Sequence, residues 1–564
     1  MSKHDFITKS NYILFLESPR KFWDRFHSPE SLPPENEFER ALMEQGMAVD
    51  RIARKRFPSG FDCQPEGASF SDCLALTASA MQEAEDSKSP RALLQPSFLH
   101  DGLFARVDIL RPDEFGGYEL LEVKAVSAPD KTHYQDVAFQ LHVLRKKGMS
   151  ISAAKIVHLN PEYVRHGELD LESLFIEADV TDKAQELQPD VISNIALARD
   201  VLAQEEPPPV DLDGAAVMNI TKPELEHYAP ELMTPDSVFR LPGIHRDKAL
   251  ILAREIREKK VAEGSDDLTV RVSELPDDAR NLKQTVFRQC TVNKQMYCDR
   301  SVLREMFDRI EFPVTFLDFE TILHAIPQFD GAKPNLQIPF QVCAFRAESP
   351  DEPIKLFEHL ADHTVADPRQ GVIACVNESM DGAGTVIAFN ASFEIMCMEG
   401  MRELAQELNM PNLVDDIKAK MVDIGKPYMG YHVYSHEQKG SGGLKSVSSA
   451  FFLEDPYKGK SVKGGAQASY LFAQMAMGNI PPEQIPDIRA GLLAYCTQDV
   501  YGMVDLAAVS EVLADIPEDK RRFGKFLKAA LKPLPEIVHE LESPVLEGRS
   551  KSPAKNKASK QIAY

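Results

Sequence analysis

The sequence has 564 residues, of which 43% are hydrophobic and 27% charged, and a formal net charge of −23. This length is too great for one hydrophobic core and predicts three or four domains at roughly 150 residues each. No apolar run approaches the roughly 18 residues that span a bilayer, and the N-terminus lacks the apolar stretch of a signal peptide. We therefore expect a cytoplasmic protein without a membrane partner. Its acidity repels phosphate, so a nucleic-acid partner would need a local basic groove or bound cations.

The first 205 residues have an α/β pattern. The predicted elements are helices at 10–26, 37–57 and 131–148 and strands at 102–112, 117–126 and 153–160. The turn DEFGG at 113–117 joins the first two strands as a predicted hairpin. The Pro-rich acidic segment 203–214 then indicates a linker, and 206–310 is predicted to be this linker and a mostly helical region.

A second α/β block is predicted over 311–515. Its predicted strands are 314–320, 339–347, 353–360 and 384–390, and its predicted helices are 368–380, 391–408 and 489–514. Three strands followed by alternating helices and strands suit a mixed sheet with helices on both faces. Residues 516–564 are predicted to form a helical end and a disordered basic tail, which either solubilises the chain or touches an anionic partner.

Acidic residues recur at three places in the second block. Asp318 and Glu320 are two apart on a predicted strand, so both project from the same face. Glu394 follows the predicted strand 384–390, and Tyr495 and Asp499 lie one helical turn apart. If these elements converge, the carboxylates repel one another unless cations lie between them. Two Mg²⁺ or Mn²⁺ ions fit this need, because they prefer carboxylate oxygens and a pair can clamp both oxygens of a phosphodiester displacement.

The stretches FLDFET, AFNASFE and YCTQD resemble the three motifs of the DEDDy 3′–5′ exonucleases, which have the RNase H-like fold. This resemblance implies metal-ligand roles for Asp318, Glu320 and Asp499 and a water-orienting role for Tyr495. Glu394 stands where the motif has Asp, so it is the expected fourth ligand with a longer side chain, and Asn390 begins this motif as an expected nucleic-acid contact.

A glycine-rich segment, 439–451, precedes the last of these motifs. Its backbone N–H groups and Lys445 could hold a phosphate of nucleic acid. A flexible loop with a serine cap explains the same residues equally well.

A second set of candidate residues lies in the first block. Asp108 is on one predicted strand, and Glu122 and Lys124 share one face of the next. The two acids can hold one or two Mg²⁺ ions, and the lysine can position water or neutralise charge on the phosphate.

This second set resembles the PD-(D/E)XK nucleases of the RecB-like branch. Under that resemblance Asp50 replaces a metal-binding His, and Gln140 begins a QxxxY motif whose Tyr is Leu144 here. Many relatives carry an iron–sulfur cluster, but Ser18 stands at the first cysteine position and four cysteine ligands are not available, so no cluster is expected.

Both blocks together resemble a bacterial family that fuses a RecB-like nuclease domain to an RNase H-like exonuclease domain. The resemblance implies a metal-dependent nuclease acting on DNA ends, with a role in repair or in defence against foreign DNA by analogy. The alternative is an accessory protein that binds nucleic acid and has lost one or both activities.

Overall fold

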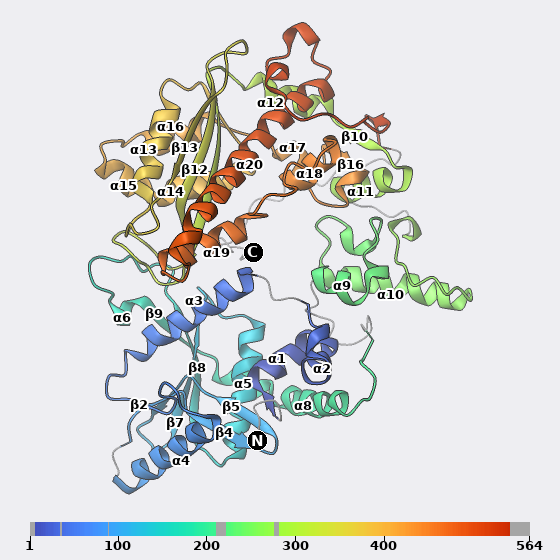
Figure 1. The fold of residues 1–564 in the computed structure, drawn as a ribbon. Helices are drawn as coiled ribbons and strands as arrows, with labels where there is room; N and C mark the ends of the chain where they lie inside the picture. The colour runs from blue at the N-terminus through green and yellow to red at the C-terminus, as the bar shows by residue number, and fades with distance from the viewer. Residues whose placement is uncertain (1–5, 34–36, 88–89, 210–221, 276–280, 542–564) are drawn as a thin grey trace, which may run out of the picture.

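The computed structural model describes residues 6–33, 37–87, 90–209, 222–275 and 281–541. The fold is mixed α/β, as the sequence predicts, with two sheet-containing blocks and a mostly helical region between them in the chain. In Figure 1 the first block, blue to cyan, lies below the second block, yellow to red, and the green helices of the middle region lie to one side. Among the described helices, none is both long and apolar enough to cross a membrane.

The larger sheet of the first block has six strands. In sheet order they are β2 (Phe61–Asp62), β3 (Leu93–Leu94), β6 (Ile109–Pro112), β7 (Tyr118–Lys124), β8 (Ile151–Leu159) and β9 (Phe175–Asp179). Strand β7 pairs antiparallel with β6 and parallel with β8. A separate small sheet has the order β1 (Ile7–Thr8), β5 (Leu103–Arg106) and β4 (Ser97–His100).

Helices cover both faces of the larger sheet. The face of the sheet to which Leu120 points packs in one core with four helices. These are α1 (Lys9–Glu17), α2 (Pro19–His27), α5 (Lys131–Lys146) and α8 (Gln188–Leu202). Leu121 and Val123 point to the other face and pack against α3 (Glu37–Arg54). Because side chains alternate along a strand, Glu122 shares the face of Leu120 and is directed toward α5.

Two predicted elements of the first block are divided in the structure. The strand predicted at 102–112 breaks at Val107–Asp108, so that β5 and β6 belong to different sheets. The break lets Asp108 Oδ2 accept the backbone N–H of Val123 on β7 at 2.8 Å. The helix predicted at 10–26 breaks at Ser18, whose hydroxyl accepts the Lys21 N–H and whose next residue, Pro19, suits the first turn of α2.

The second block contains a five-stranded sheet. In sheet order the strands are β13 (Lys355–Leu360), β12 (Leu336–Ala347), β11 (Val314–His324), β14 (Thr385–Ala388) and β15 (Met421–Asp423). The pairs β13–β12 and β12–β11 are antiparallel, and β11–β14 and β14–β15 are parallel. The sheet is therefore mixed, as predicted.

The two faces of β11 have different partners. Leu317 and Phe319 pack in a core whose helices are α13 (Arg369–Met380), α14 (Ala391–Gly400), α15 (Arg402–Glu407) and α16 (Leu413–Lys420). Phe316, on the opposite face, packs with the long helix α20 (Ile485–Leu513). Alternation places Asp318 and Glu320 on this same face, and Figure 1 shows α20 crossing it. The helix predicted at 391–408 is divided between α14 and α15.

The middle region is mostly helical, as predicted. Its helices are α9 (Lys222–Tyr228), α10 (Arg246–Ala262), α11 (Leu282–Asn293) and α12 (Arg300–Asp308). A small sheet joins it to the rest of the chain, in the order β16 (Val433–Ser435), β10 (Met296–Cys298) and β17 (Ile537–Val538). The helical end predicted after residue 515 is not found in the described residues. Residues 516–541 instead contain two short 3₁₀ turns and β17 (Ile537–Val538). Residues 210–214 of the predicted linker and residues 542–564, which contain the predicted tail, lie outside the described residues.

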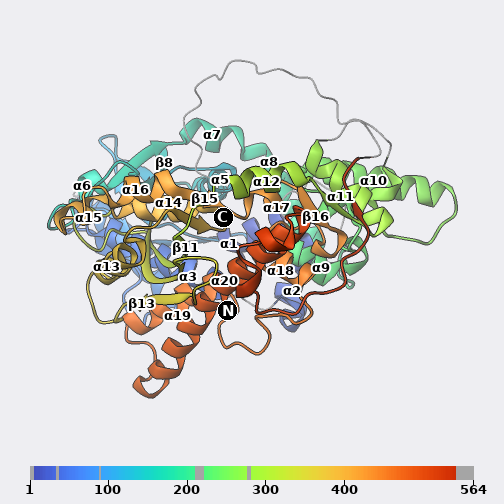
Figure 2. The same ribbon diagram turned by 90° about the horizontal axis from the view of Figure 1, so that it is seen from above.

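The two blocks contact each other through the loop between β11 and β12. Ala325 and Ile326 of this loop pack in the core that contains α3. The Ala325 N–H donates to Gln45 Oε1 at 3.0 Å, and Gly331 and Ala332 exchange backbone hydrogen bonds with Arg165. Helix α19 (Gly465–Ala476) also lies against α3, and the two views in Figures 1 and 2 agree on this placement.

Candidate active sites

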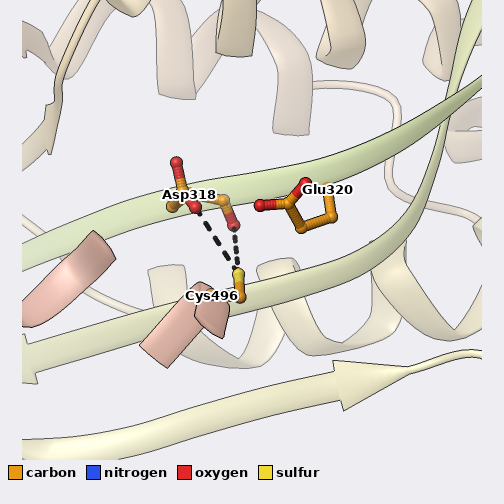
Figure 3. A group of neighbouring side chains, drawn as sticks. All are labelled: Asp318, Glu320 and Cys496. Carbon is orange, nitrogen blue, oxygen red and sulfur yellow. Dashed lines mark hydrogen bonds between the residues drawn. The ribbon is translucent and has the colours of Figure 1, made fainter. Parts of the chain in front are cut away.

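Asp318 and Glu320 of β11 form the centre of a carboxylate cluster in the second block. Glu320 is 6% exposed, and Asp318 is partly buried. A ligand atom from each of Asp318, Glu320 and Cys496 lies within 4.8 Å of the other two. Figure 3 shows the two carboxylates and the thiol directed toward one another from β11 and α20.

Cys496 of α20 lies beside the carboxylates, and its thiol contacts a predicted metal ligand. Its Sγ donates to Asp318 Oδ2 at 3.5 Å and lies 3.9 Å from the Asp318 carbonyl oxygen. Burial raises the pKa of this thiol, and the nearby Cys343, Asp318 and Glu320 raise it further. The raised pKa favours the protonated thiol, which donates a hydrogen bond to Asp318.

Asp499, one turn beyond Tyr495 on α20, completes this side of the cluster. It is 9% exposed, and it accepts a hydrogen bond from the hydroxyl of Tyr457. Burial raises the pKa of Asp499, although hydrogen bonds from Tyr457 and Tyr495 partly oppose the shift. The pKa of the Tyr495 hydroxyl is raised above its usual 10 by burial and by Asp499 and Glu320, so Tyr495 is a proton donor here rather than a base.

Glu394 enters the cluster from the first turn of α14. It is 3% exposed, and its Oε2 has no hydrogen-bond partner among the described residues. Burial and the Asp318 carboxylate raise its pKa well above the usual value. The Glu394 carboxylate therefore lies near enough to Asp318 for the two charges to repel each other. Asn390 caps the start of α14 with left-handed backbone geometry (φ 65°), and its exposed side chain accepts a hydrogen bond from Ser392.

The four carboxylates repel one another. Burial and Asp499 raise the pKa of Asp318, and burial, Asp318 and Asp499 raise that of Glu320. A buried group of acids with these shifts is unstable as free anions and favours bound cations. The unpartnered Glu394 Oε2 and the all-oxygen carboxylate set fit hard divalent ions. Asp318, Glu320, Glu394 and Asp499 are thus a suitable ligand set for Mg²⁺ or Mn²⁺.

Lysines lie at the rim of this cluster. Lys445 Nζ sits 4.7 Å and 4.8 Å from the ring centres of Tyr457 and Tyr495 and donates to the Lys463 carbonyl at 2.5 Å. Lys445 and Lys460 are both close enough to lower the pKa of Asp499. The glycine-rich segment does lead into a helix, α18 (Leu444–Phe451), and Lys445 lies in its first turn. The rim therefore provides the local positive charge that an acidic chain needs to hold phosphate.

The first block contains a second cluster, centred on Glu122, which is 1% exposed. Glu122 Oε1 accepts from Lys9 Nζ at 2.6 Å and from Lys124 Nζ at 2.8 Å. Lys124 also contacts Asp136 Oδ2 at 2.5 Å. Burial would lower the pKa of Lys124, but Asp136, Glu122 and Asp108 together raise it, so this lysine is held as a cation.

Gln140 fixes the geometry of this second cluster. Its Nε2 donates to Glu122 Oε2 at 2.8 Å and to Asp136 Oδ1 at 2.9 Å. Gln140 is fully buried. The expectation that it contacts nucleic acid is therefore wrong for this conformation, because its side chain is enclosed and engaged by the two acids.

Asp50 and Asp108 are joined to the second cluster by a residue without a sequence motif. Gln95 Nε2 lies 3.2 Å from an oxygen of each of them. Asp50 also pairs with Arg54 at 2.9 Å, and burial raises its pKa. The structure therefore brings together all five predicted residues of the first block, namely Asp50, Asp108, Glu122, Lys124 and Gln140.

The two clusters differ in charge balance. In the first block, Lys9, Lys124 and Arg54 face Asp50, Asp108, Glu122 and Asp136. In the second block, Asp318, Asp499 and Glu394 all raise the pKa of Glu320, and the cations that lower the pKa of Asp499 are Lys445 and Lys460. The first cluster is nearly neutral on its own, whereas the second has a strong need for external cations.

Sequence reasoning missed Lys9, Gln95 and Asp136 in the first cluster and Cys496 and Tyr457 in the second. Lys9 precedes all the recognisable motifs, and Tyr457 lies in an irregular segment between α18 and α19. Asp136 could have been found, because it is four residues before Gln140 on a predicted helix and so shares its face.

Comparison with known proteins gives one match. A family model described as a domain of unknown function (DUF2779) matches residues 315–442, a range that contains Asp318, Glu320 and Glu394. No curated protein matches the chain, and no solved structure matches it.

Proposed function

We propose that this protein is a metal-dependent nuclease whose catalytic centre is the carboxylate cluster of Asp318, Glu320, Glu394 and Asp499. The observation that carries the proposal is that ligand atoms of Asp318 and Glu320 lie within 4.8 Å of each other at a largely buried place. Asp499 and Glu394 are near enough to raise the pKa of Glu320 as well. Buried carboxylates that repel one another in this way favour bound cations.

Each residue of the cluster has a proposed role. The four acids hold two Mg²⁺ or Mn²⁺ ions, which would activate water and neutralise charge on the scissile phosphate. The protonated Tyr495 hydroxyl orients the attacking water. Tyr457 fixes the Asp499 carboxylate through its hydrogen bond, and Cys496 does the same for Asp318. Lys445, at the rim, and exposed Asn390 are the proposed contacts to the nucleic-acid backbone.

The sheet supports the proposed architecture of the second block. Its strand order, with β11 central between an antiparallel pair and two parallel strands, suits an RNase H-like domain. The location of the acids on β11, at the start of α14 and on one face of α20 supports the DEDDy resemblance. We accordingly infer a 3′–5′ exonuclease acting on DNA ends, and a role in repair or defence follows by analogy alone.

A second nuclease centre is a candidate in the first block, which we propose to be a RecB-like PD-(D/E)XK domain. The convergence of Asp50, Asp108, Glu122 and Lys124 favours it. Lys9, however, donates to Glu122 where a divalent ion would compete for the same oxygen. This centre would therefore bind metal more weakly than the cluster of the second block.

The alternative function is an accessory protein that binds nucleic acid without cleaving it. Incubation of the full chain with end-labelled single- and double-stranded DNA and RNA, in Mg²⁺, Mn²⁺ or EDTA, separates the two. Metal-dependent release of mononucleotides from the 3′ end supports the proposed function. Retention of intact strands bound to the protein in all three conditions supports the alternative.

A further inference from the structure

One thiol lies among the carboxylates of the second block. A ligand atom from each of Asp318, Glu320 and Cys496 lies within 4.8 Å of the other two, and Figure 3 shows the three side chains directed toward one another. Mg²⁺ and Mn²⁺ prefer the carboxylate oxygens, whereas Zn²⁺ binds thiolate and carboxylate ligands together. The number of these side chains that bind an ion therefore depends on which ion enters the group.

The distance between Cys496 and Asp318 suits a pair of zinc ligands. Zinc bonds of about 2.3 Å to sulfur and about 2.1 Å to oxygen, at a tetrahedral angle, place the two ligand atoms about 3.6 Å apart. Cys496 Sγ lies 3.5 Å from Asp318 Oδ2. An ion can therefore replace the thiol proton with little movement of α20 against β11. The proton passes to solvent, since a coordinated thiol is deprotonated.

Two buried oxygens beside this group have no hydrogen-bond partner in the described part of the chain, namely Glu394 Oε2 and Gln341 Oε1. Gln341 is 1% exposed and lies directly opposite Glu320 in the antiparallel pair of β11 and β12, so the two side chains share one face of the sheet. Its Nε2 donates to the Leu492 carbonyl of α20 at 3.0 Å, which leaves Oε1 unpaired. Buried acceptors are normally paired, and a water molecule on a bound ion would supply the missing O–H donor.

The ligand set of this group differs from that of the full carboxylate cluster. It does not include Asp499 or Glu394, so an ion bonded to Cys496 is held by only two of the four acids. Zinc also binds most ligand sets more tightly than manganese does. Zn²⁺ drawn toward the thiol would therefore displace Mn²⁺ from Asp318 and Glu320 and prevent the pair of ions that clamps a phosphodiester displacement.

We propose that Asp318, Glu320 and Cys496 form a zinc site, and that Zn²⁺ bound there inhibits the nuclease centre. Zinc has three protein ligands in this site and a water molecule in the fourth position, with Gln341 Oε1 as the acceptor for that water. The inhibition rests on the proposed function, whereas the binding of zinc does not and can be measured without a nucleic acid.

The test begins with titration of the metal-free full chain with Zn²⁺, Mn²⁺ and Co²⁺, in which a competing chelator sets the zinc affinity. Cys496→Ser keeps an O–H donor for Asp318 but removes the sulfur. It should weaken Zn²⁺ binding about a hundredfold or more and change Mn²⁺ binding by less than about threefold. Bound Co²⁺ should give wild type a thiolate-to-cobalt charge-transfer band in the near ultraviolet, and Cys496→Ser should lack this band.

The matched control is Cys298→Ser. Cys298 is buried in the same core as Cys496, and its thiol also lies against an oxygen, the Leu513 carbonyl at 3.6 Å. This control should keep the cobalt band and the zinc affinity of wild type. Melting temperatures show whether each variant is folded, and Cys496→Ala provides the same comparison if serine prevents folding at position 496.

An inhibition assay tests the second half of the proposal. With Mn²⁺ present, the Zn²⁺ concentration that halves mononucleotide release should be about a hundredfold higher for Cys496→Ser than for wild type or Cys298→Ser. Cobalt binding without the band, or equal zinc affinity in wild type and Cys496→Ser, would overturn the zinc site. Equal inhibition of these two proteins would overturn its inhibitory role. A cobalt band in a wild-type protein that releases no mononucleotide would support the zinc site and reject the proposed function.

Discussion

The thiol of Cys496 donates a hydrogen bond to the carboxylate of Asp318, joining α20 to β11 at the centre of the carboxylate cluster. One turn of α20 on either side of this contact lie Leu492 and Asp499. The contact thus helps to orient α20 so that Asp499 faces Asp318 and Glu320. These two residues are far from Asp499 in the sequence. The acids are close because these two elements are packed, and the packing makes the cluster costly when cations are absent.

Asp318→Asn should stabilise the protein in EDTA. The change removes one of four mutually repelling charges and should raise the melting temperature by about 2–4 °C, equivalent to roughly 1 kcal/mol for a domain of this size. Thermal unfolding followed by circular dichroism measures this shift. Added Mn²⁺ should raise the melting temperature of wild type more than that of the variant, and an equal Mn²⁺ effect on both would contradict the assignment of Asp318 as a ligand.

The same repulsion predicts a pH dependence. The pKa of Asp318 in the folded protein is raised above the usual 3.8, so the folded state keeps this proton to higher pH than the unfolded chain does. The contribution of Asp318 to the free energy of unfolding is therefore fully present below about pH 3.8. It is lost as the pH rises through the raised pKa. The advantage of Asp318→Asn over wild type should consequently disappear in acid. An advantage that grows as the pH falls would refute the sign of the shift.

Glu394→Asp should lower the rate of metal-dependent hydrolysis about tenfold or more. The Glu394 carboxylate lies near enough to Asp318 for that acid to raise its pKa, and a side chain shorter by one methylene would withdraw it from the ions. Single-turnover hydrolysis of a labelled oligonucleotide is the measurement. A rate above that of wild type would mean that the native site is decayed and that Asp restores a lost ligand.

Tyr495→Phe should reduce the rate about hundredfold or more, since a positioned proton donor contributes on this scale. Tyr457→Phe should have a smaller effect, because Tyr457 contacts Asp499 rather than the reacting water. Tyr501→Phe, on the same helix, is the control and should be neutral, because the change keeps the ring that packs against Phe345 and Lys528. In steady-state assays Tyr501→Phe should be the fastest of the three variants and Tyr495→Phe the slowest. A Tyr501→Phe variant that folds normally but is inactive would contradict this prediction.

Glu122→Gln should leave 3′-end nucleotide release within twofold of wild type, because sites in separate domains without shared ligands behave additively. It should lower the melting temperature, since Lys9 and Lys124 lose the negative charge that they share. Glu119→Gln is the matched control on the same strand, where the pairs with Arg111 and Lys155 are more exposed. Loss of all nucleotide release in Glu122→Gln would show that the two clusters are functionally coupled and not independent.

Alternation along strands and helical spacing predicted much of the local structure. They placed Asp318 with Glu320, Glu122 with Lys124 and Tyr495 with Asp499, because each pair depends only on the period of one element. They did not predict the features that depend on tertiary contacts. The break at Asp108 depends on the Val123 N–H across the sheet, and the contributions of Lys9 and Tyr457 depend on segments that the fold brings in from a distance.

The most direct test of the central claim compares Asp499→Asn with Asp487→Asn on the same helix, where Asp487 is exposed and Asp499 is buried in the cluster. Release of mononucleotides from a 5′-labelled DNA strand is measured with Mn²⁺ and with EDTA. Wild type and Asp487→Asn should release mononucleotides in Mn²⁺ but not in EDTA. Asp499→Asn should release them at least a hundredfold more slowly. Equal release by the two variants, or release that persists in EDTA, would contradict it.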